Sequence, residues 1–165
     1  MASQSAAQSV RPAESRSVGA VGSALGSFCP GAPKLGRMST AARRVRLEAR
    51  EGRVTGQTAG LAPGHAQANL VILPRDHADD FRAFCERNPR PCPLLEQLDA
   101  GAYETSVVAD GADVRRDLPR YRVWRDGSLH CECDDVVDLW RDDLVTFLIG
   151  CSFSFEEALL QARYR

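Results

Sequence analysis

A continuous apolar run, residues 68–73 closed by Pro74, is the feature that most constrains the fold of this chain. The run has the length of a strand rather than of a helix, and its lack of alternation is typical of a strand buried on both faces. It therefore predicts a central strand around which a single core must form. A chain of 165 residues with 44% hydrophobic residues is long enough to supply that core.

Helices are predicted on both sides of this strand. Ser39-Thr40 is a capping pair, and the helix that it opens is expected to end at Gly52. A loop rich in Gly, Thr and Pro follows at 53–67. After the strand, Asp76 is expected to cap a second helix, which ends at Asn88-Pro89. The inner face of this second helix is expected to consist of Ala78, Phe81, Phe84 and Cys85.

The next elements are predicted from shorter signals. Prolines make the turn at 88–93 rigid, and residues 94–98 are expected to form a short helical piece, with a strand at 104–108. A longer helix is predicted to end at Gly150, and a capping box at Ser154 predicts one last helix. The apolar residues at helical spacing in the longer helix are Leu139, Trp140, Leu144, Phe147 and Leu148.

The strongest turn signal is Asp126-Gly127, which lies between the strand-like segments Tyr121–Arg125 and Ser128–Cys133. This dipeptide favours the positive φ angles that the two-residue turn of a β-hairpin requires. Strands mixed with helices indicate a mixed α/β (α+β) fold, with a central buried strand, a β-hairpin and several flanking helices.

Residues 1–37 are rich in Ser, Ala and Gly and show no apolar periodicity. Such a segment buries too little surface to offset its ordering entropy, so a disordered tail is expected. Two alternatives stay open: Met38 opens a more regular sequence, as a true start would, and an Arg-containing, acid-poor segment also resembles a transit peptide. We expect a cytoplasmic protein, or one of the mitochondrial matrix if the segment is a transit peptide.

Charge and composition exclude several classes of function. Residues 1–50 carry a net charge of +6 and residues 51–165 one of -7, so the acidic body offers no surface for nucleic acid. The apolar run at 144–151 is too short for a membrane span of about 20 residues. Lys34 is the sole lysine, which argues against Schiff-base chemistry in the body. Six cysteines without a secretory signal favour free thiols over a disulfide framework.

The segment Asp113-Val-Arg-Arg-Asp117, followed by Arg120, offers the first candidate site. Arginine is well shaped for a substrate carboxylate, which suits Arg115 and Arg120. Asp113 or Asp117 is a candidate acid or base, or a residue that orients such an arginine. A solvated salt-bridge cluster is the alternative interpretation.

The junction at 150–156 offers a second candidate site, with Cys151, Ser152 and Ser154 beside the free backbone N–H groups of a helix start. These groups suit a carboxylate or a developing oxyanion. The alternative is that Ser154 only caps and Cys151 only packs. Cys92, fixed between two prolines, is a further candidate, and a buried thiol in a tight turn is its alternative.

A metal site is not expected. His130-Cys-Glu-Cys133 contains ligand types, but on a strand Cys131 and Cys133 share one face and His130 points away. Two thiolates match no common zinc spacing. We therefore predict neither a metal nor a cofactor.

Four segments resemble one known family, the hydro-lyases that share their domain with D-glutamate cyclase. They are GLAPGHAQANLVILP (60–74), DFRAFCERNPRPCPLL (80–95), GADVRRDLPRYRVWRDG (111–127) and DLWRDDLVTFLIGCSFSFEEALL (138–160). The resemblance implies a lyase that eliminates water. In the D-glutamate cyclase branch, D-glutamate closes to 5-oxo-D-proline with loss of water.

This reaction requires a carboxylate clamp, an acid or base, and donors for a tetrahedral oxyanion. The candidates supply these types, and the expected partner is a small-molecule carboxylate or amino acid. We assign Asp113, Asp117, Cys151, Ser152 and Ser154 to catalysis, and Arg115, Arg120, Asn69 and Cys92 to substrate binding.

The chain departs from the family pattern at two places. Arg116 replaces the Thr of the family's Asp-Ile-Arg-Thr-Asp. Family members also continue beyond the position of Leu160, with stretches similar to His-Gly-Ala-Pro-Val-His and Trp-Ala-Cys-Gly-Val-Thr-Pro. We therefore expect residues 38–165 to be the N-terminal part of a larger domain, incomplete and inactive alone. A non-catalytic remnant or carboxylate-binding module is the alternative.

Overall fold

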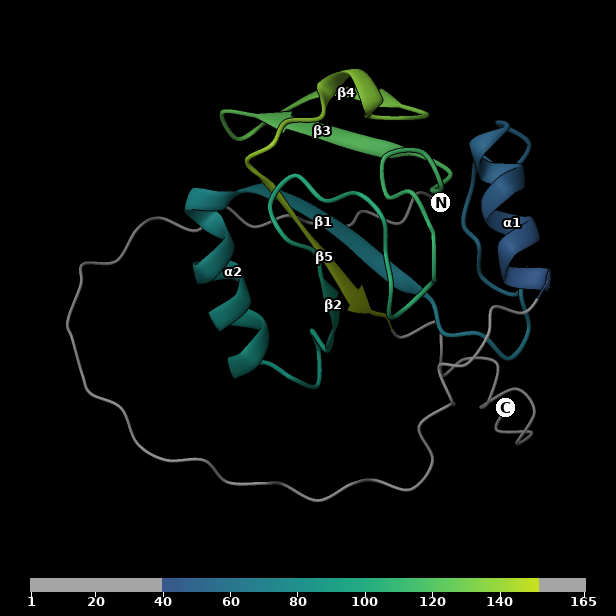
Figure 1. Ribbon diagram of the computed structural model, residues 1–165, viewed down its shortest axis with the longest axis horizontal. Helices are drawn as coiled ribbons and strands as arrows, with labels where there is room; N and C mark the ends of the chain where they lie inside the picture. The colour runs from purple at the N-terminus through teal and green to yellow at the C-terminus, as the bar shows by residue number, and fades with distance from the viewer. Residues whose placement is uncertain (1–39, 152–165) are drawn as a thin grey trace.

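The computed structural model describes residues 40–151, which form a mixed α+β fold of helices and antiparallel strands (Figure 1). This is the predicted fold class. The expected tail at 1–37 and the helix expected at Ser154 lie outside the described residues. The elements in chain order are α1 Thr40–Arg50, β1 Ala68–Pro74, α2 Arg75–Arg87, β2 Leu94–Gln97, β3 Tyr121–Arg125, β4 Ser128–Cys133, the 3-10 turn Val137–Leu139 and β5 Leu144–Gly150.

The larger sheet has three antiparallel strands in the order β1-β5-β2. β1 and β5 pair without irregularity, from Ala68 opposite Gly150 to Pro74 opposite Leu144. β2 pairs with the other edge of β5, and the register shifts between Leu94 and Glu96. This shift leaves Leu95 as a bulge and places Glu96 opposite Leu148.

Residues 68–74 form a strand, but the prediction that it is central is wrong. Among residues 40–151, β1 lies at the edge of the sheet and β5 at its centre. The helix predicted from Leu139 to Gly150 is also wrong. Leu139 closes a single 3-10 turn, and Leu144–Gly150 is the buried strand. Short apolar runs do not separate strand from buried helix by spacing alone, and here pairing on both edges decides for the strand.

The predictions for two short segments, the helical piece at 94–98 and the strand at 104–108, are also wrong. Residues 94–97 pair with β5 as a strand instead of forming a helical piece. At 104–108 the structure has only an isolated bridge between Glu104 and Asp113. The N–H groups of residues 106–108 donate to the side chain of Glu96 rather than to a neighbouring strand.

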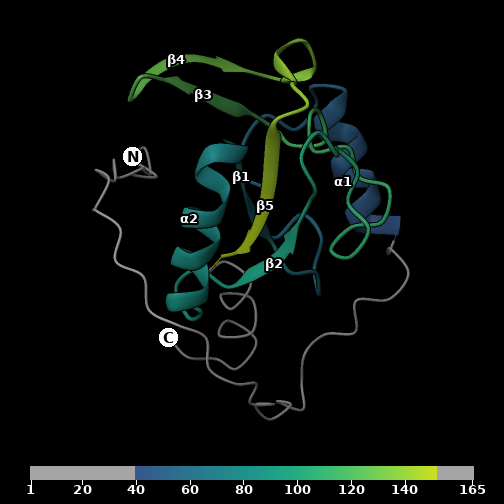
Figure 2. The same ribbon diagram turned by 60° about the vertical axis from the view of Figure 1, so that its left-hand side comes forward.

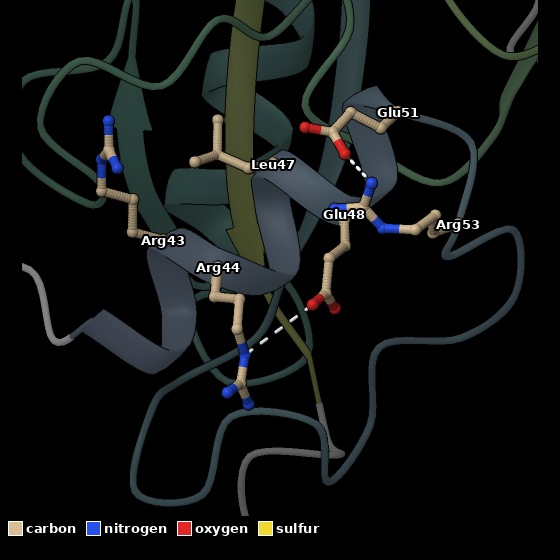
Figure 3. A pocket seen from close by; sticks show the side chains of 6 residues that line it. All are labelled: Arg43, Arg44, Leu47, Glu48, Glu51 and Arg53. Carbon is tan, nitrogen blue, oxygen red and sulfur yellow. Dashed lines mark ion pairs between the residues drawn. The ribbon is translucent and has the colours of Figure 1, made fainter.

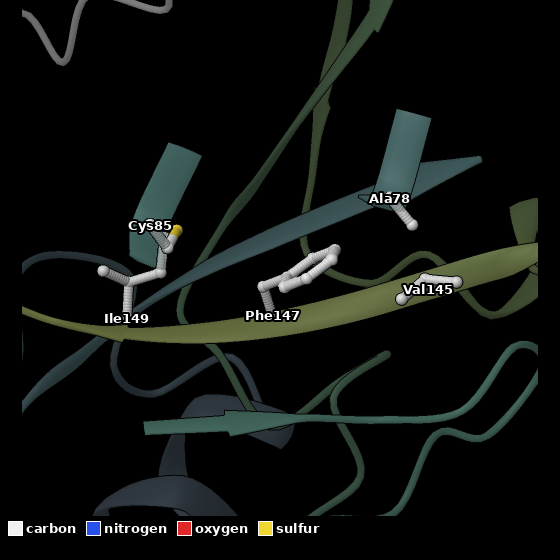
Figure 4. Close-up of a cluster of buried hydrophobic side chains, with 5 residues drawn as sticks. All are labelled: Ala78, Cys85, Val145, Phe147 and Ile149. Atoms are coloured by element: carbon white, nitrogen blue, oxygen red, sulfur yellow. The ribbon is translucent and has the colours of Figure 1, made fainter. Parts of the chain in front are cut away.

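Helix α2 covers one face of the three-stranded sheet. Ala78 and Cys85 pack there against Val145, Phe147 and Ile149 of β5 (Figure 4). Phe81 adds an edge-to-face contact with Phe147, with ring centroids 5.0 Å apart. Phe84 does not belong to this face as predicted, because 43% of the residue is exposed.

The ends of α2 agree with the sequence at one terminus only. The helix begins at Arg75, directly after Pro74, so Asp76 is not the cap. Asp76 instead lies in the first turn, where a negative charge is favourable. The other end is at Asn88 as predicted, and the N–H of Asn88 donates to the carbonyl of Cys85.

The predicted hairpin is confirmed. β3 and β4 pair from Tyr121 opposite Cys133 to Arg125 opposite Ser128. The turn residues have positive φ, 49° at Asp126 and 75° at Gly127, as a type I′ turn requires. The hairpin lies beyond one end of the larger sheet (Figures 1 and 2).

Helix α1 lies on the opposite side of the molecule from α2 (Figures 1 and 2). It buries Val45 and Ala49, and Gly52 follows it with φ of 71°, which confirms the predicted helix end. Within residues 40–151 neither helix has the length and apolarity that crossing a membrane demands.

Candidate functional site

The segment 113–117 folds into a tight turn whose two carboxylates are buried. The carbonyl of Asp113 accepts hydrogen bonds from the N–H groups of Arg116 at 3.2 Å and Asp117 at 2.9 Å. Asp117 closes the turn in the other direction, because its Oδ2 accepts the N–H of Asp113 at 3.0 Å. The two aspartates are therefore fixed relative to each other.

Asp113 holds Arg115 by a bidentate ion pair. Nε of Arg115 donates to Oδ1 at 2.9 Å and Nη2 donates to Oδ2 at 2.9 Å. Oδ1 also accepts the backbone N–H of Arg115, and Oδ2 accepts Nε of Arg116 at 3.1 Å. The carboxylate is thus saturated with donors.

Burial raises the pKa of Asp113, but the hydrogen bonds and charges of Arg115 and Arg116 outweigh it, so the pKa is lowered overall. The hydrogen bond to Asp113 in turn raises the pKa of Arg115. Asp113 therefore stays ionised at neutral pH. A permanently charged carboxylate suits the orienting role considered for it better than that of an acid.

The guanidinium of Arg115 also stacks on an aromatic ring, with its central carbon 3.5 Å from the ring centroid of Tyr103. Asp113 occupies the Nε–Nη2 edge. No residue between 40 and 151 accepts a hydrogen bond from Nη1, and 17% of the side chain is exposed. Asp113 and Tyr103 therefore fix the direction of the guanidinium, and Nη1 makes no hydrogen bond within the described residues.

Asp117 connects this turn to α1. Its Oδ1 accepts Nε of Arg50 at 2.6 Å, and Nη1 of Arg46 lies 3.7 Å from Oδ2. The pair with Arg50 joins residues 67 positions apart in the chain. Asp117 therefore anchors the helix to the turn that presents Arg115.

Arg120 lies outside this network. It is an exposed residue whose Nη1 lies 3.5 Å from Oε2 of Glu132 on the hairpin. Arg122 pairs with the same carboxylate at 2.8 Å. Hydrogen bonding to Arg122 lowers the pKa of Glu132. The structure thus assigns the two proposed clamps to different surroundings, and Arg115 is the one held in a fixed direction.

Three other candidates, Asn69, Cys92 and Cys151, lie towards the end of the sheet where β1 begins and β5 ends. Sγ of Cys151 lies 3.6 Å from the carbonyl oxygen of Gln67, and the N–H of Gly150 donates to the carbonyl of Pro93 at 2.9 Å. Asn69 is exposed on β1, and Cys92 packs against the core beneath α2. Ser152 and Ser154 lie outside the described residues.

Sequence reasoning missed Glu96 and Tyr103. Glu96 is a buried carboxylate held by the backbone N–H groups of three consecutive residues, Ser106 to Val108. A glutamate paired with backbone groups has no partner residue type to search for, so no sequence signal could have found it. The stacking of Tyr103 on Arg115 likewise depends on the tertiary fold.

A shallow pocket of about 340 Å³ lies on α1, and none of the candidate residues lines it (Figure 3). Its walls carry ion pairs between Arg44 and Glu48 and between Arg53 and Glu51. It is lined by Arg43, Arg44, Leu47, Glu48, Glu51 and Arg53. Because it is an open surface of solvated charges, it does not define a site.

The cysteines of the hairpin lie as the strand pattern indicates. Cys131 and Cys133 are half-buried, and His130 is exposed. Burial and the neighbouring thiol of Cys131 raise the pKa of Cys133, which keeps it protonated. Among residues 40–151 no group of three or more His, Cys, Asp or Glu side chains is placed to hold a metal.

The chain is thus a mixed α+β protein in which an arginine is fixed between a carboxylate and an aromatic ring. It is similar to several proteins that are named putative hydro-lyase. Putative hydro-lyases from Bordetella petrii, Streptomyces coelicolor and Rubrobacter xylanophilus are 64%, 61% and 57% identical to it over 122, 120 and 124 residues. The matches cover 74%, 73% and 75% of this chain but 46%, 43% and 48% of the relatives. The chain therefore spans about half the length of the relatives that it matches. No protein-family model matches it.

Proposed function

We propose that this chain provides the carboxylate-binding part of a hydro-lyase, and that the reaction is the cyclisation of D-glutamate to 5-oxo-D-proline. The observation that carries the proposal is the guanidinium of Arg115, which Asp113 and Tyr103 hold in a fixed direction while its Nη1 makes no hydrogen bond within residues 40–151. The identity of 56–64% to proteins named putative hydro-lyase supports the reaction class.

The chemistry requires such a group. The amine of D-glutamate attacks the carbon of the side-chain carboxyl group, a tetrahedral oxyanion forms, and water leaves as the new amide closes the ring. The α-carboxylate takes no part in bond making, so it is the group by which the substrate is held. An arginine already oriented by a carboxylate loses little entropy on binding it in bidentate geometry.

In this proposal Asp113 orients Arg115 and remains charged. Asp117 fixes the turn from the side of α1. The oxyanion donors stay assigned to Cys151, Ser152 and Ser154, and the substrate contacts to Asn69, Cys92 and Arg120. Donors at that place would act by stabilising the charge that develops on the attacked carboxyl oxygen.

A carboxylate-binding module without catalysis is the second candidate function. One observation favours it: both buried aspartates of the network are already occupied by arginine ion pairs. Residues 113–117 therefore supply a binding group but no available base. The two candidates share the ligand and differ in whether the ligand is converted.

The test measures binding and conversion separately on the full 165-residue chain. Isothermal titration calorimetry follows D-glutamate binding, and chiral chromatography follows 5-oxo-D-proline. We expect Arg115→Lys to weaken binding about tenfold or more, because a hydrogen bond to a charged group contributes about 1.5–3 kcal/mol. Arg125→Lys, an exposed change at the hairpin turn, is the control. Binding without product would favour the binding module, and no binding by the unchanged chain would refute the proposal.

A further inference from the structure

We infer that Glu96 is a positioning residue that fixes the loop carrying Tyr103 and thereby sets the direction of Arg115. The inference rests on the proposed function for the role of Arg115 but not for the geometry. Glu96 lies on β2 and is 7% exposed. Its Oε1 accepts the N–H groups of Ser106 at 2.8 Å and Val107 at 3.1 Å, and Oε2 accepts that of Val108 at 2.8 Å.

This arrangement is unusual for a buried carboxylate. Within residues 40–151 Glu96 takes part in no ion pair, so the three backbone N–H groups and the hydroxyl of Ser106, whose Oγ lies 3.4 Å from Oε1, compensate the burial of its carboxyl group. Three N–H groups converge on it because residues 106–108 bend around the side chain. The loop has this shape because the carboxylate is present, and a neutral apolar side chain would leave three donors without acceptors.

The loop in turn is closed at its base by the residues that hold Arg115. The N–H of Val114 donates to the carbonyl of Tyr103 at 2.9 Å, and Glu104 bridges to Asp113. A second pair of bonds, between Thr105 and residues 111 and 112, closes the next step at 2.9 and 3.0 Å. Tyr103 and Asp113 are therefore the two ends of one closed loop, and Glu96 holds its tip.

Glu96 itself is fixed by the sheet. It lies opposite Leu148 of the central strand, and the N–H of Leu98 donates to the carbonyl of Thr146 at 2.9 Å. The central strand β5 therefore fixes Glu96, and Glu96 fixes the loop. The loop in turn fixes the ring of Tyr103 and the carboxylate of Asp113, which hold Arg115. Replacement of Glu96 should therefore increase the mobility of the Arg115 guanidinium, although the two side chains are not in contact.

The experiment compares Glu96→Gln and Glu96→Ala with the control Glu86→Gln, which changes an exposed glutamate of α2. Amide hydrogen exchange of Ser106, Val107 and Val108 reports on the loop. The NMR signal of Nε–H of Arg115, which lies beside the Tyr103 ring, reports on the position of the guanidinium. Titration with D-glutamate reports on the site.

We expect Glu96→Ala to remove the protection of the three amides and to move the Arg115 signal to its value in an unstructured peptide. D-glutamate binding should weaken about tenfold, in line with a loss of one charged hydrogen bond. The side-chain amide oxygen of Glu96→Gln still accepts hydrogen bonds, so its exchange, Arg115 signal and D-glutamate affinity should lie between those of the unchanged chain and of Glu96→Ala. If Glu96→Ala does not fold, Glu96→Gln alone should show the same changes at smaller size.

The outcomes separate the inference from the proposed function. Lost protection at 106–108 with an unchanged Arg115 signal would overturn the positioning role, whatever the binding result. A shifted Arg115 signal in a chain that never binds D-glutamate supports the positioning role and rejects the proposed function instead. Unchanged exchange in both Glu96 variants would overturn the inference at its first step.

Discussion

Asp113→Asn probes the aspartate–arginine network by removing one charge while keeping the shape of the side chain. The carboxylate accepts three hydrogen bonds from Arg115 and one from Arg116, at 2.9–3.1 Å. In the asparagine variant one oxygen becomes an NH₂ group, which faces guanidinium donors. The variant therefore loses the ion pair and leaves a mostly buried arginine without its counter-charge.

The size of the effect follows from burial. Breaking one partner of a buried ion pair costs about 3–5 kcal/mol. Arg116 is 46% exposed, so its share is small, whereas the side chain of Arg115 is 17% exposed. We expect a loss of about 3 kcal/mol, the low end of that range, because Arg115 can still reach water. A domain with a stability of about 5–15 kcal/mol remains folded after such a loss.

The pH dependence gives an independent check. The pKa of Asp113 is lower in the folded chain than the value of about 3.9 in an unfolded one. A group with a depressed folded pKa stabilises the fold above its unfolded pKa, and this contribution disappears as the pH falls through the folded value. The difference in stability between the unchanged chain and Asp113→Asn should therefore be constant between about pH 5 and 7 and narrow below about pH 4.

Urea unfolding followed by circular dichroism at pH 7 and pH 3 measures both quantities. Asp79→Asn, an exposed change on α2, is the matched control and should alter the free energy of unfolding by less than about 0.5 kcal/mol. If Asp113→Asn is as stable as the control at pH 7, or if its deficit is as large at pH 3, the network does not hold the turn as described.

The elements that could be predicted are those whose signals are local. Asp126-Gly127 fixes the hairpin because few residue pairs adopt positive φ at two successive positions. Helix α2 follows from its apolar face and from the Asn88-Pro89 stop. In both cases the residues that decide the structure are neighbours in the sequence, so the pattern contains the information.

The elements that could not be predicted depend on residues far apart in the chain. β5 is central because β1 pairs on one edge and β2 on the other. Its sequence also fits a buried helix. The helical spacing of Leu139 and Trp140 relative to β5 is accidental, since both residues precede the strand. Only the pairing partners distinguish the two, and they lie about 50 to 80 residues upstream of β5.

The candidate site shows the same division. The sequence indicated that the segment 113–117 supplies aspartates and arginines, because the residue types have that chemistry. It could not indicate that Asp113 would form an ion pair with Arg115, or that Arg120 would pair with Glu132. Nor could it indicate that Arg50 would reach Asp117. Which charges meet is a property of the fold, and that property decides which arginine is held in a fixed direction.

Two further predictions test the described packing. Gly127→Val places a β-branched residue at a φ of 75°, and we expect it to destabilise the chain by about 1–2 kcal/mol in urea unfolding, with Ser128→Val as control. Phe147→Ala should cost about 3–5 kcal/mol, because the side chain is 0% exposed and its removal leaves a cavity beside Phe81. Phe84→Ala removes the same atoms from a residue that is 43% exposed, so it should cost only about 1–2 kcal/mol. A helix at 139–150 would not require this contrast between the two phenylalanines, whereas a central strand beneath α2 does. Equal losses in the two variants would therefore contradict the placement of β5 in the core.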